Sequence, residues 1–357
     1  MKINGAVMLL FRQVCALAVP SKVCYNGHIM KNYIIFDLEW NQSPEGKENS
    51  VESIPFEIIE VGAVKLDGDF HLISEFHRLI TPKVYPQLHY KISEVTHMDM
   101  EELRQEGEPF VDVIRDFLEW CGRDFWFCTW GSMDLTELQR NMEYYQADIP
   151  FERPLYYYDV QKLYALARGN VREKMSLDKA VEELALEQDR PFHRALDDAF
   201  YTGKVLGRMD PALWEPYISV DYYRVPEKKE EEIYLRFPTY SKFVSRTFPT
   251  KEEAMEDKTV ADIICPQCKR MLRKKVRWFS LNQRQYFSLG VCPQHGPVRG
   301  KIRMKKGENG EFYVVKTMKI VDEEGVRSLF EKREEQRYKR HVRNDIKKVR
   351  GTIGRPV

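Results

Sequence analysis

The chain has 357 residues, of which 43% are hydrophobic and 31% are charged, and its formal net charge at pH 7 is +1. This length predicts two folded units, the first large enough to bury its own core, and the sequence has no internal repeat or low-complexity tract. Seven cysteines, three of them in one candidate zinc site, suit a reducing compartment better than a disulfide framework. We therefore expect a cytoplasmic protein.

Residues 1–30 form an extension ahead of the first predicted strand. The stretch from Met1 to Pro20 is biased towards apolar residues, but Arg12 interrupts it and it is too short to span a bilayer. A poor signal peptide is one interpretation. We prefer translation from Met30, because the first strand begins almost at once after it, and we expect no membrane partner.

The first predicted strand, Tyr33–Trp40, ends in the motif Asp37-Leu38-Glu39. Side chains two residues apart on a strand point to the same face, so Asp37 and Glu39 project together. Two carboxylates on one face repel each other unless a cation lies between them. The motif therefore predicts a metal site, although Asp-x-Glu at a strand end also occurs without one.

Strand and helix patterns follow along the chain. The predicted strands are 33–40, 58–66, 70–80, 124–130 and 156–159, and the predicted helices are 110–121, 135–145, 160–167 and 176–186. This order predicts an α/β fold with a mixed five-stranded sheet and flanking helices. Active sites in such sheets gather at strand ends, where Asp37, Glu39 and Asp134 would lie. Asp134 can also simply begin its helix, since Asp134-x-x-Glu137 fits a capping box.

A last helix in this half is predicted from about Arg194 to Met209. On it, Asp198 shares a stripe that can lie against a sheet with Ala195, Ala199, Thr202 and Leu206. Asp197 lies about 100° away, on a side with Arg194, Tyr201 and Lys204 that reads as solvated. We therefore assign Asp198 to the metal and treat Asp197 as an exposed neighbour. His193 should lie in the turn before the helix and face the same cleft, although a satisfied loop histidine is the alternative.

The ligand type indicates which ions these carboxylates hold. Oxygen ligands suit Mg²⁺ or Mn²⁺, whereas zinc favours histidine and thiolate. Two such ions about 3.5–4 Å apart can hold the attacking and leaving oxygens of a phosphodiester. His193 is the candidate base for the water, because imidazole titrates near neutral pH.

Together, the three motifs resemble those of the DEDDh 3′–5′ exonucleases, the DnaQ-like group of the RNase H-like superfamily. The resemblance covers about Asn32 to Met209, and we expect an exonuclease domain at 31–209. It implies an RNase H-like fold and the release of nucleoside monophosphates from 3′ ends of single-stranded RNA or DNA. It also implies His193 as general base and, as ligands of two Mg²⁺ or Mn²⁺ ions, Asp37, Glu39, Asp134 and Asp198.

The sequence departs from the family around the surface that usually holds the terminal nucleotide. Many members carry Thr-Thr-Gly or Thr-Cys after the first motif, whereas this chain has Trp40-Asn41-Gln42. Thr96-His97 stands where Thr-Gly is common. The substrate-binding residues that the resemblance implies are Leu38, Trp40, Asn41, Thr96 and His97.

A second signal follows the expected connecting segment 210–259. Cys265-Pro266-Gln267-Cys268 is answered by Cys292-Pro293-Gln294-His295, which is the spacing of a Cys₃His zinc site. Four protein ligands would close the site and make the Zn²⁺ structural. Strand-like segments at 277–280 and 286–289 predict a zinc-ribbon-like domain at 260–310. Incidental thiols are the alternative, and a redox pair is disfavoured because no βαβ pattern surrounds the motif.

Charge separates the two halves of the chain. Residues 260–357 hold 25 Lys+Arg against 10 Asp+Glu, so residues 1–259 are acidic. The ribbon and a basic tail at 311–357 would give a salt-sensitive grip on nucleic acid, with Trp278, Tyr286 and Phe287 stacking on bases. The alternative is that the basic residues form ordinary solvated faces.

Three functions follow from these observations. The leading one is a metal-dependent 3′–5′ exonuclease with a nucleic-acid-binding tail. The second is a non-catalytic nucleic-acid-binding protein on a degenerate exonuclease fold. The third is a zinc-ribbon protein of transcription or RNA handling in which the enzymatic half is subsidiary.

Overall fold

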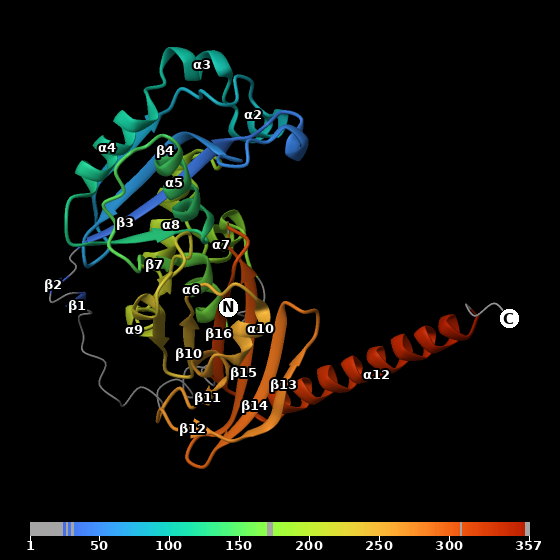
Figure 1. The fold of residues 1–357 in the computed structure, drawn as a ribbon. Helices are drawn as coiled ribbons and strands as arrows, with labels where there is room; N and C mark the ends of the chain where they lie inside the picture. The colour runs from blue at the N-terminus through green and yellow to red at the C-terminus, as the bar shows by residue number, and fades with distance from the viewer. Residues whose placement is uncertain (1–23, 26–27, 30–31, 170–173, 308, 354–357) are drawn as a thin grey trace. The chain divides into compact units, whose positions relative to one another are not determined.

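The computed structural model describes residues 24–25, 28–29, 32–169, 174–307 and 309–353 (Figure 1). The chain divides between Tyr223 and Arg224 into two compact units. Most of the expected extension 1–30, including Met30, lies outside the described residues. Its described part is a short antiparallel ladder of β1 (Cys24–Tyr25) and β2 (His28–Ile29). Within the described residues, no helix is both long enough and apolar enough to cross a bilayer.

The first unit is built on a mixed six-stranded sheet in the order β5-β4-β3-β6-β7-β8. The strands β3, β4 and β5 pair antiparallel, β3, β6 and β7 pair parallel, and β8 closes the edge antiparallel to β7. The bounds are β3 (Asn32–Asn41), β4 (Glu57–Leu66), β5 (Leu72–Leu79), β6 (Phe125–Thr129), β7 (Tyr156–Asp159) and β8 (Ser219–Val220). The predicted α/β class is confirmed, with a sixth strand because β8, only two residues long, leaves no periodic signal.

Helices cover both faces of this sheet (Figure 1). One face carries a core with residues of α4 and α5, and the other carries a core with residues of α6 to α9. The helices are α2 (Tyr90–Thr96), α3 (Met100–Gln105), α4 (Phe110–Cys121), α5 (Met133–Tyr144), α6 (Val160–Ala167), α7 (Leu177–Glu183), α8 (Ala195–Gly207) and α9 (Pro211–Trp214), with a 3₁₀ turn η1 (Gly46–Asn49). The alternation of β3 follows from this arrangement: Ile34 and Phe36 enter the α4–α5 core, whereas Ile35 enters the core on the α8 side.

The second unit holds an antiparallel six-stranded sheet in the order β13-β14-β15-β16-β10-β9. Its strands are β9 (Ile233–Arg236), β10 (Tyr240–Val244), β13 (Lys274–Ser280), β14 (Gln285–Cys292), β15 (Gly296–Lys306) and β16 (Phe312–Ile320), and a separate hairpin joins β11 (Ile263–Ile264) to β12 (Met271–Leu272). The helices are η2 (Lys229–Glu231), α10 (Lys251–Glu256), α11 (Lys258–Ala261) and α12 (Glu323–Ile353).

This sheet differs from the domain division expected from the sequence. The expected connecting segment 210–259 supplies β9 and β10, and the expected tail 311–357 begins with β16, which lies at the centre of the sheet. The predicted hairpin segments 277–280 and 286–289 do fall in β13 and β14. The predicted hairpin is therefore one edge of a larger sheet, in which β15 pairs with β14, and β16 joins β15 to β10 and β9.

Candidate active site

Asp37 and Glu39 project from the same face of β3, opposite Gly62 and Glu60 of β4. Leu38, between them, is buried in the core on the other face. The strand therefore fixes both carboxylates on the side of the sheet that faces α8, as the alternation of the sequence predicts.

The helix α8 brings Asp198 to the same place, and Gly62 makes the approach possible. A Cβ atom on Gly62 would lie 1.9 Å from the backbone nitrogen of Leu196, so any other residue would push the start of α8 away from β4. The outcome is a compact group in which one ligand oxygen from each of Asp37, Glu39 and Asp198 lies within 4.8 Å of the others. We call these three residues the acidic cluster.

Asp134 lies in the first turn of α5 and is almost completely buried. Its carboxylate accepts hydrogen bonds from the backbone N–H groups of Leu38 and of Asp134 itself. It is not part of the group within 4.8 Å, but among charged neighbours it has the largest effect on the pKa of Asp37. The predicted capping box is absent: the helix begins after Ser132, which makes no side-chain capping bond, and Glu137 pairs with Arg140 at 3.2 Å.

Burial and repulsion within this group disfavour its negative charges. Desolvation, followed by the charges of Asp134, Glu39 and Asp198, raises the pKa of Asp37 well above its ordinary range. Desolvation first, and then neighbouring carboxylates, also raise the pKa of Glu39 to about 8 and that of Asp134 to about 7. For Asp198, mainly burial raises the pKa to about 6. Carboxylates gathered in this way fit a hard divalent cation, which would supply the missing positive charge.

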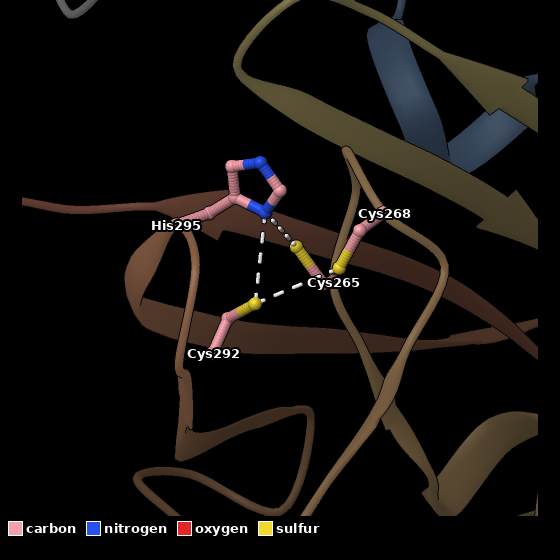
Figure 2. A group of neighbouring side chains, drawn as sticks. All are labelled: Cys265, Cys268, Cys292 and His295. Carbon is pink, nitrogen blue, oxygen red and sulfur yellow. Dashed lines mark hydrogen bonds between the residues drawn. The ribbon is translucent and has the colours of Figure 1, made fainter.

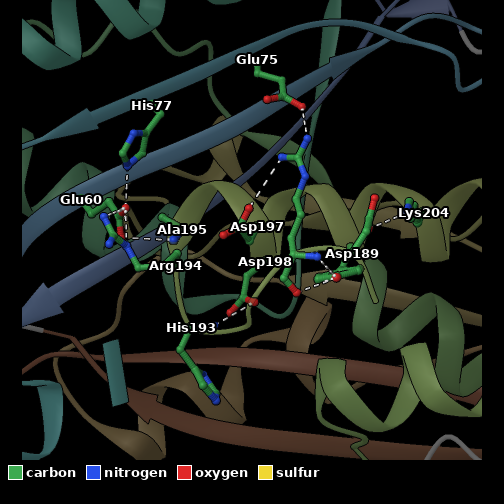
Figure 3. A network of polar contacts seen from close by, with 12 residues as sticks. Glu60, Glu75, His77, Asp189, His193, Arg194, Ala195, Asp197, Asp198 and Lys204 are labelled. Atoms are coloured by element: carbon green, nitrogen blue, oxygen red, sulfur yellow. Dashed lines mark hydrogen bonds and ion pairs between the residues drawn. The ribbon is translucent and has the colours of Figure 1, made fainter. Parts of the chain in front are cut away.

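Glu60, which sequence reasoning missed, ties α8 to the sheet (Figure 3). Its side chain is fully buried and receives hydrogen bonds from Arg194 Nε at 3.0 Å and from the backbone nitrogen of Ala195 at 3.2 Å. The Nε2 atom of His77 on β5 lies 2.6 Å away. Burial alone would raise the pKa of Glu60, but the bonds from His77 and Arg194 outweigh it and hold the pKa below its usual value. The signal in the sequence was a carboxylate inside the apolar run of β4, directly opposite Glu39.

His193 lies in the turn before α8, as predicted, with a left-handed φ of 68°. Its backbone N–H donates to Asp198 Oδ1 at 3.2 Å. The side chain is exposed, and Figure 3 shows the imidazole directed away from Asp198. The structure thus brings the backbone of His193 to the cluster and leaves its ring outside it.

The side of α8 that carries Asp197 is less exposed than the sequence suggests. The prediction that Tyr201 is solvated is wrong: it is fully buried, and its hydroxyl exchanges hydrogen bonds with the backbone of Arg190 at 2.7 and 2.8 Å. Asp197 retains only 18% of its side-chain exposure and pairs with Arg190 at 3.6 Å. The segment before α8 covers this face, which helical periodicity alone does not reveal.

Two of the residues implied as substrate-binding make hydrogen bonds that fix neighbouring parts of the fold. Asn41 is fully buried; its amide nitrogen donates to the carbonyls of Tyr85 and Gln87, and its oxygen accepts from the nitrogen of His89. The hydroxyl of Thr96 donates to Ile92 O at 2.8 Å and accepts from Met98 N at 3.3 Å. These bonds engage the polar groups of Asn41 and Thr96 within the fold, and a role of either residue in substrate binding stays a prediction.

The remaining three residues differ in how accessible they are. The side chain of Leu38 is in the core, and its backbone N–H donates a hydrogen bond to the carboxylate of Asp134. Trp40 is half-buried, with its ring 5.9 Å from that of Phe56, and His97 is exposed at the end of α2 with a φ of 58°. Only Trp40 and His97 therefore offer side-chain surface at these positions.

In the second unit, the four predicted zinc ligands converge (Figure 2). Cys265 and Cys268 lie on the loop between β11 and β12, and Cys292 and His295 lie on the turn between β14 and β15. The distances are 3.5 Å from Cys265 Sγ to His295 Nδ1, and 3.6 Å from Cys292 Sγ to both Cys268 Sγ and His295 Nδ1. Tetrahedral Zn²⁺ with bonds of about 2.3 Å separates its ligand atoms by roughly 3.4–3.8 Å, so the donor set fits zinc.

Electrostatics at this cluster are consistent with metal ligation. Although desolvation opposes ionisation, hydrogen bonds from the backbone of Gln294 and His295 and from the His295 ring lower the pKa of Cys292 to about 6. A thiolate is the form that binds metal. Of the aromatic residues expected to stack on bases, Phe287 is buried, whereas Trp278 and Tyr286 are half-buried beside one core, and Trp278 donates to Ala261 O at 2.7 Å.

The model of the family described as Exonuclease (RNase_T) matches residues 34–206, slightly under half of the chain. This segment contains the whole acidic cluster together with Asp134 and His193, and the match supports a nuclease domain in the first unit. No curated protein matches the chain significantly.

Several of the similar solved structures are described as exonucleases. The nuclease domain of 3′hExo, described as a DEDDh family member bound to rAMP, is 20% identical with a TM-score of 0.43, over 50% of this chain and 90% of that one. Exonuclease I of E. coli in complex with a dA16 oligonucleotide is 13% identical with a TM-score of 0.43, over 72% of this chain and 54% of that one. Pop2p of S. pombe, in a form with Mg²⁺ and Mn²⁺ bound, is 16% identical with a TM-score of 0.39, over 51% and 87%.

Proposed function

We propose that this chain is a metal-dependent 3′–5′ exonuclease that removes nucleoside monophosphates from single-stranded RNA or DNA. The observation that carries the proposal is the acidic cluster, in which carboxylates from β3 and from α8 converge within 4.8 Å. The family match over residues 34–206 supports phosphodiester hydrolysis as its use.

Within this proposal, Asp37, Glu39 and Asp198 hold Mg²⁺ or Mn²⁺, and Asp134 stands beside them to complete a site for two ions. Bound divalent ions would polarise the phosphoryl group and make a water molecule more acidic. The fold keeps the carboxylates of β3 and α8 close together. Gly62 lets α8 approach β4, and Glu60 accepts hydrogen bonds from Arg194 and Ala195 at the start of α8.

His193 is the proposed base that accepts the proton of the attacking water. Its backbone is already held beside Asp198, so the turn places the side chain at the rim of the site. For the ring to act, it turns towards the cluster when substrate binds, as catalytic contacts often tighten only in the complex. The accessible Trp40 and His97 are the side chains proposed to contact the terminal nucleotide.

Cleavage of end-labelled strands tests the proposal. Purified full-length chain is incubated with 5′-labelled single-stranded RNA or DNA in Mg²⁺, in Mn²⁺ or in EDTA. We expect a ladder that shortens one nucleotide at a time from the 3′ end and that EDTA abolishes. Absence of cleavage in both metals, or cleavage that persists in EDTA and in Asp37→Ala protein, contradicts it. The exposed Asp112→Asn serves as a matched control.

A second candidate, a non-catalytic nucleic-acid-binding protein, is favoured by the outward direction of the His193 ring (Figure 3). In that case the chain binds labelled strands and divalent ions but releases no monophosphates. The same assay, read alongside strand binding, separates the two functions.

For the second unit, we propose one structural Zn²⁺ held by Cys265, Cys268, Cys292 and His295.

A further inference from the structure

The strand β15 has two chemically opposite faces. Alternate residues Val298, Gly300, Ile302 and Met304 are buried, whereas the residues between them are basic, namely Arg299, Lys301, Arg303 and Lys305. Because side chains on a strand alternate between faces, this pattern puts a row of cations along one side of the sheet.

The apolar side is already filled. Ile302 and Met304 belong to a core with residues of α10 and α11, and Val298 packs with the cysteine knuckles. A Cβ on Gly300 would lie 2.6 Å from the ring of Trp278, which shows how closely this side is packed. The basic residues therefore lie on the opposite side of the sheet.

The first turns of α12 lie on that opposite side. Val326 and Leu329 pack against Val276, Phe287 and Leu289, and Gln336 Nε2 donates to the carbonyls of Ser280 and Leu281 at 2.6 and 3.1 Å. This docking brings a further cation, Lys332, next to the row on β15. The Nζ atoms of Lys332 and Lys301 lie 5.4 and 5.7 Å from the centre of the Phe287 ring.

Three of these cations, Lys301, Arg303 and Lys332, are gathered without an acidic partner among the described residues. Burial lowers the pKa of Lys301, and the charges of Arg303, Arg299 and Lys332 lower it further; every charge in this balance is positive. Over the described residues, Lys301, Arg303 and Lys332 form no ion pair. Other basic residues of the same unit do have acidic partners, such as Arg246 with Glu232 and Asp257, and Arg337 with Glu334.

Like charges held together in a folded protein repel each other, and a bound anion relieves that repulsion. The anion must carry several charges, because the cations are spread along the strand at a spacing of about 6.6–6.8 Å between alternate residues. A single phosphate reaches only part of such a row. A chain of phosphates reaches all of it.

We propose that the face formed by Lys301, Arg303 and Lys332, here called the basic face, binds the phosphate backbone of a single-stranded nucleic acid. The contacts are to phosphates and not to bases, since the nearby aromatic Phe287 is buried. Binding is therefore independent of sequence and strongly dependent on salt. The choice of nucleic acid over other polyanions rests on the proposed function of the first unit.

Anisotropy of a dye-labelled mixed-sequence 20-mer measures this binding directly. The protein is the full chain carrying Asp37→Ala, zinc-loaded and without other divalent ions, so that strand binding is scored whether or not the first unit is a nuclease. The test variant adds Lys301→Gln and Arg303→Gln. The control adds Arg337→Gln and Lys339→Gln, an equal loss of charge at residues that pair with Glu334 and Glu335.

We expect the test pair to raise Kd at least about fivefold and the control pair less than about twofold. Loss of two phosphate contacts should reduce the slope of log K against log salt by about 1.4 for a single strand. Zinc content and Tm equal to those of the parent show that the variant is folded. Equal effects of the two pairs, an unchanged slope, or equally strong competition by poly-glutamate of the same charge would overturn the proposal. Cleavage by protein with Asp37 intact reports separately on the exonuclease.

Discussion

The acidic cluster of the first unit and the basic face of the second use the same strand geometry for different purposes. In each, a strand places like charges two residues apart: Asp37 and Glu39 on β3, and Lys301 and Arg303 on β15. The carboxylates are partly buried, and a helix in close contact with β4 holds them together. On the basic face, Arg303 is exposed and Lys301 only half-buried.

The difference indicates what each surface can hold. A small divalent ion needs ligands at fixed short distances, which a buried and rigid group supplies. A flexible polyanion needs an accessible row of charges and no exact geometry. The Glu60 bonds to α8 have no counterpart among the contacts of Lys301 and Arg303, as expected if only the acidic cluster must be positioned for chemistry.

The substitution Asp37→Ala should have the largest effect. It removes the carboxylate at the centre of the acidic cluster, and we expect hydrolysis to fall by about 10³-fold or more at any Mg²⁺ concentration, because ion binding supplies several kcal/mol to the transition state. Strand binding by the basic face should be unchanged. Hydrolysis within tenfold of the parent would break the assignment.

Removal of zinc should affect the structure of the second unit and not that of the first. Cys292→Ser, or a strong chelator followed by dialysis, should unfold the sheet edge around the knuckles and abolish strand binding, since structural zinc contributes about 10–16 kcal/mol in small zinc domains. Circular dichroism, zinc content and anisotropy measure the change. Cys128→Ser, at a buried thiol in the first unit, is the control for losing a cysteine. Full zinc occupancy in Cys292→Ser protein would refute this ligand set.

Glu60→Gln tests whether a residue outside the acidic cluster holds α8, and with it Asp198, in position. Glutamine cannot neutralise Arg194, so α8 should be held less firmly, and we expect a loss of about 10–100-fold in kcat or in apparent Mg²⁺ affinity. The Mg²⁺ dependence of the rate distinguishes positioning from a general loss of stability. Glu75→Gln, which disrupts the pair with Arg190, should cost much less. Equal effects of the two changes would count against the role of Glu60.

The ion-free protein should lose stability as the pH rises, whereas ordinary acid denaturation is a loss of stability as the pH falls. The pKa values of about 8 for Glu39 and about 7 for Asp134 lie above the ordinary values near 4. The folded state then binds more protons than the unfolded state between pH 4 and pH 8, and the stability from these groups is lost as pH rises through that window. We expect Tm of the zinc-loaded protein without Mg²⁺ or Mn²⁺ to fall by a few degrees from pH 5.5 to pH 8.5, and added Mg²⁺ to reduce the fall.

The control for this pH effect is Glu39→Gln protein, in which the fall should be smaller. A Tm of the zinc-loaded parent protein without Mg²⁺ or Mn²⁺ that rises over the same range would mean that the carboxylates are not gathered in one desolvated site.

The sequence was most informative where local periodicity determines structure. The strand β7 and the helices α4 and α6 match their predicted bounds, and alternation on β3 placed Asp37 and Glu39 on the face that Asp198 reaches. The short helices α2, α3 and α9 were missed because helices of four to seven residues gain most of their stability from tertiary packing.

What the sequence could not supply were partners distant along the chain. Glu60 meets Arg194 across 134 positions, and β10 pairs with β16 across 71 to 79 positions. Asn41 and Thr96 were assigned to substrate by resemblance, whereas the structure uses their polar groups to fix neighbouring loops. Pairings of this kind depend on the folded topology and leave no periodic signal.

The most direct test of the account is Mn²⁺ binding, measured by calorimetry on the full chain without nucleic acid. If Asp37 and Asp198 hold the ion, Mn²⁺ binds saturably to the zinc-loaded protein, and this binding is lost in Asp37→Ala and in Asp198→Asn but retained in Lys301→Gln/Arg303→Gln. Binding that is absent from the parent protein, or that survives both carboxylate substitutions, would contradict it.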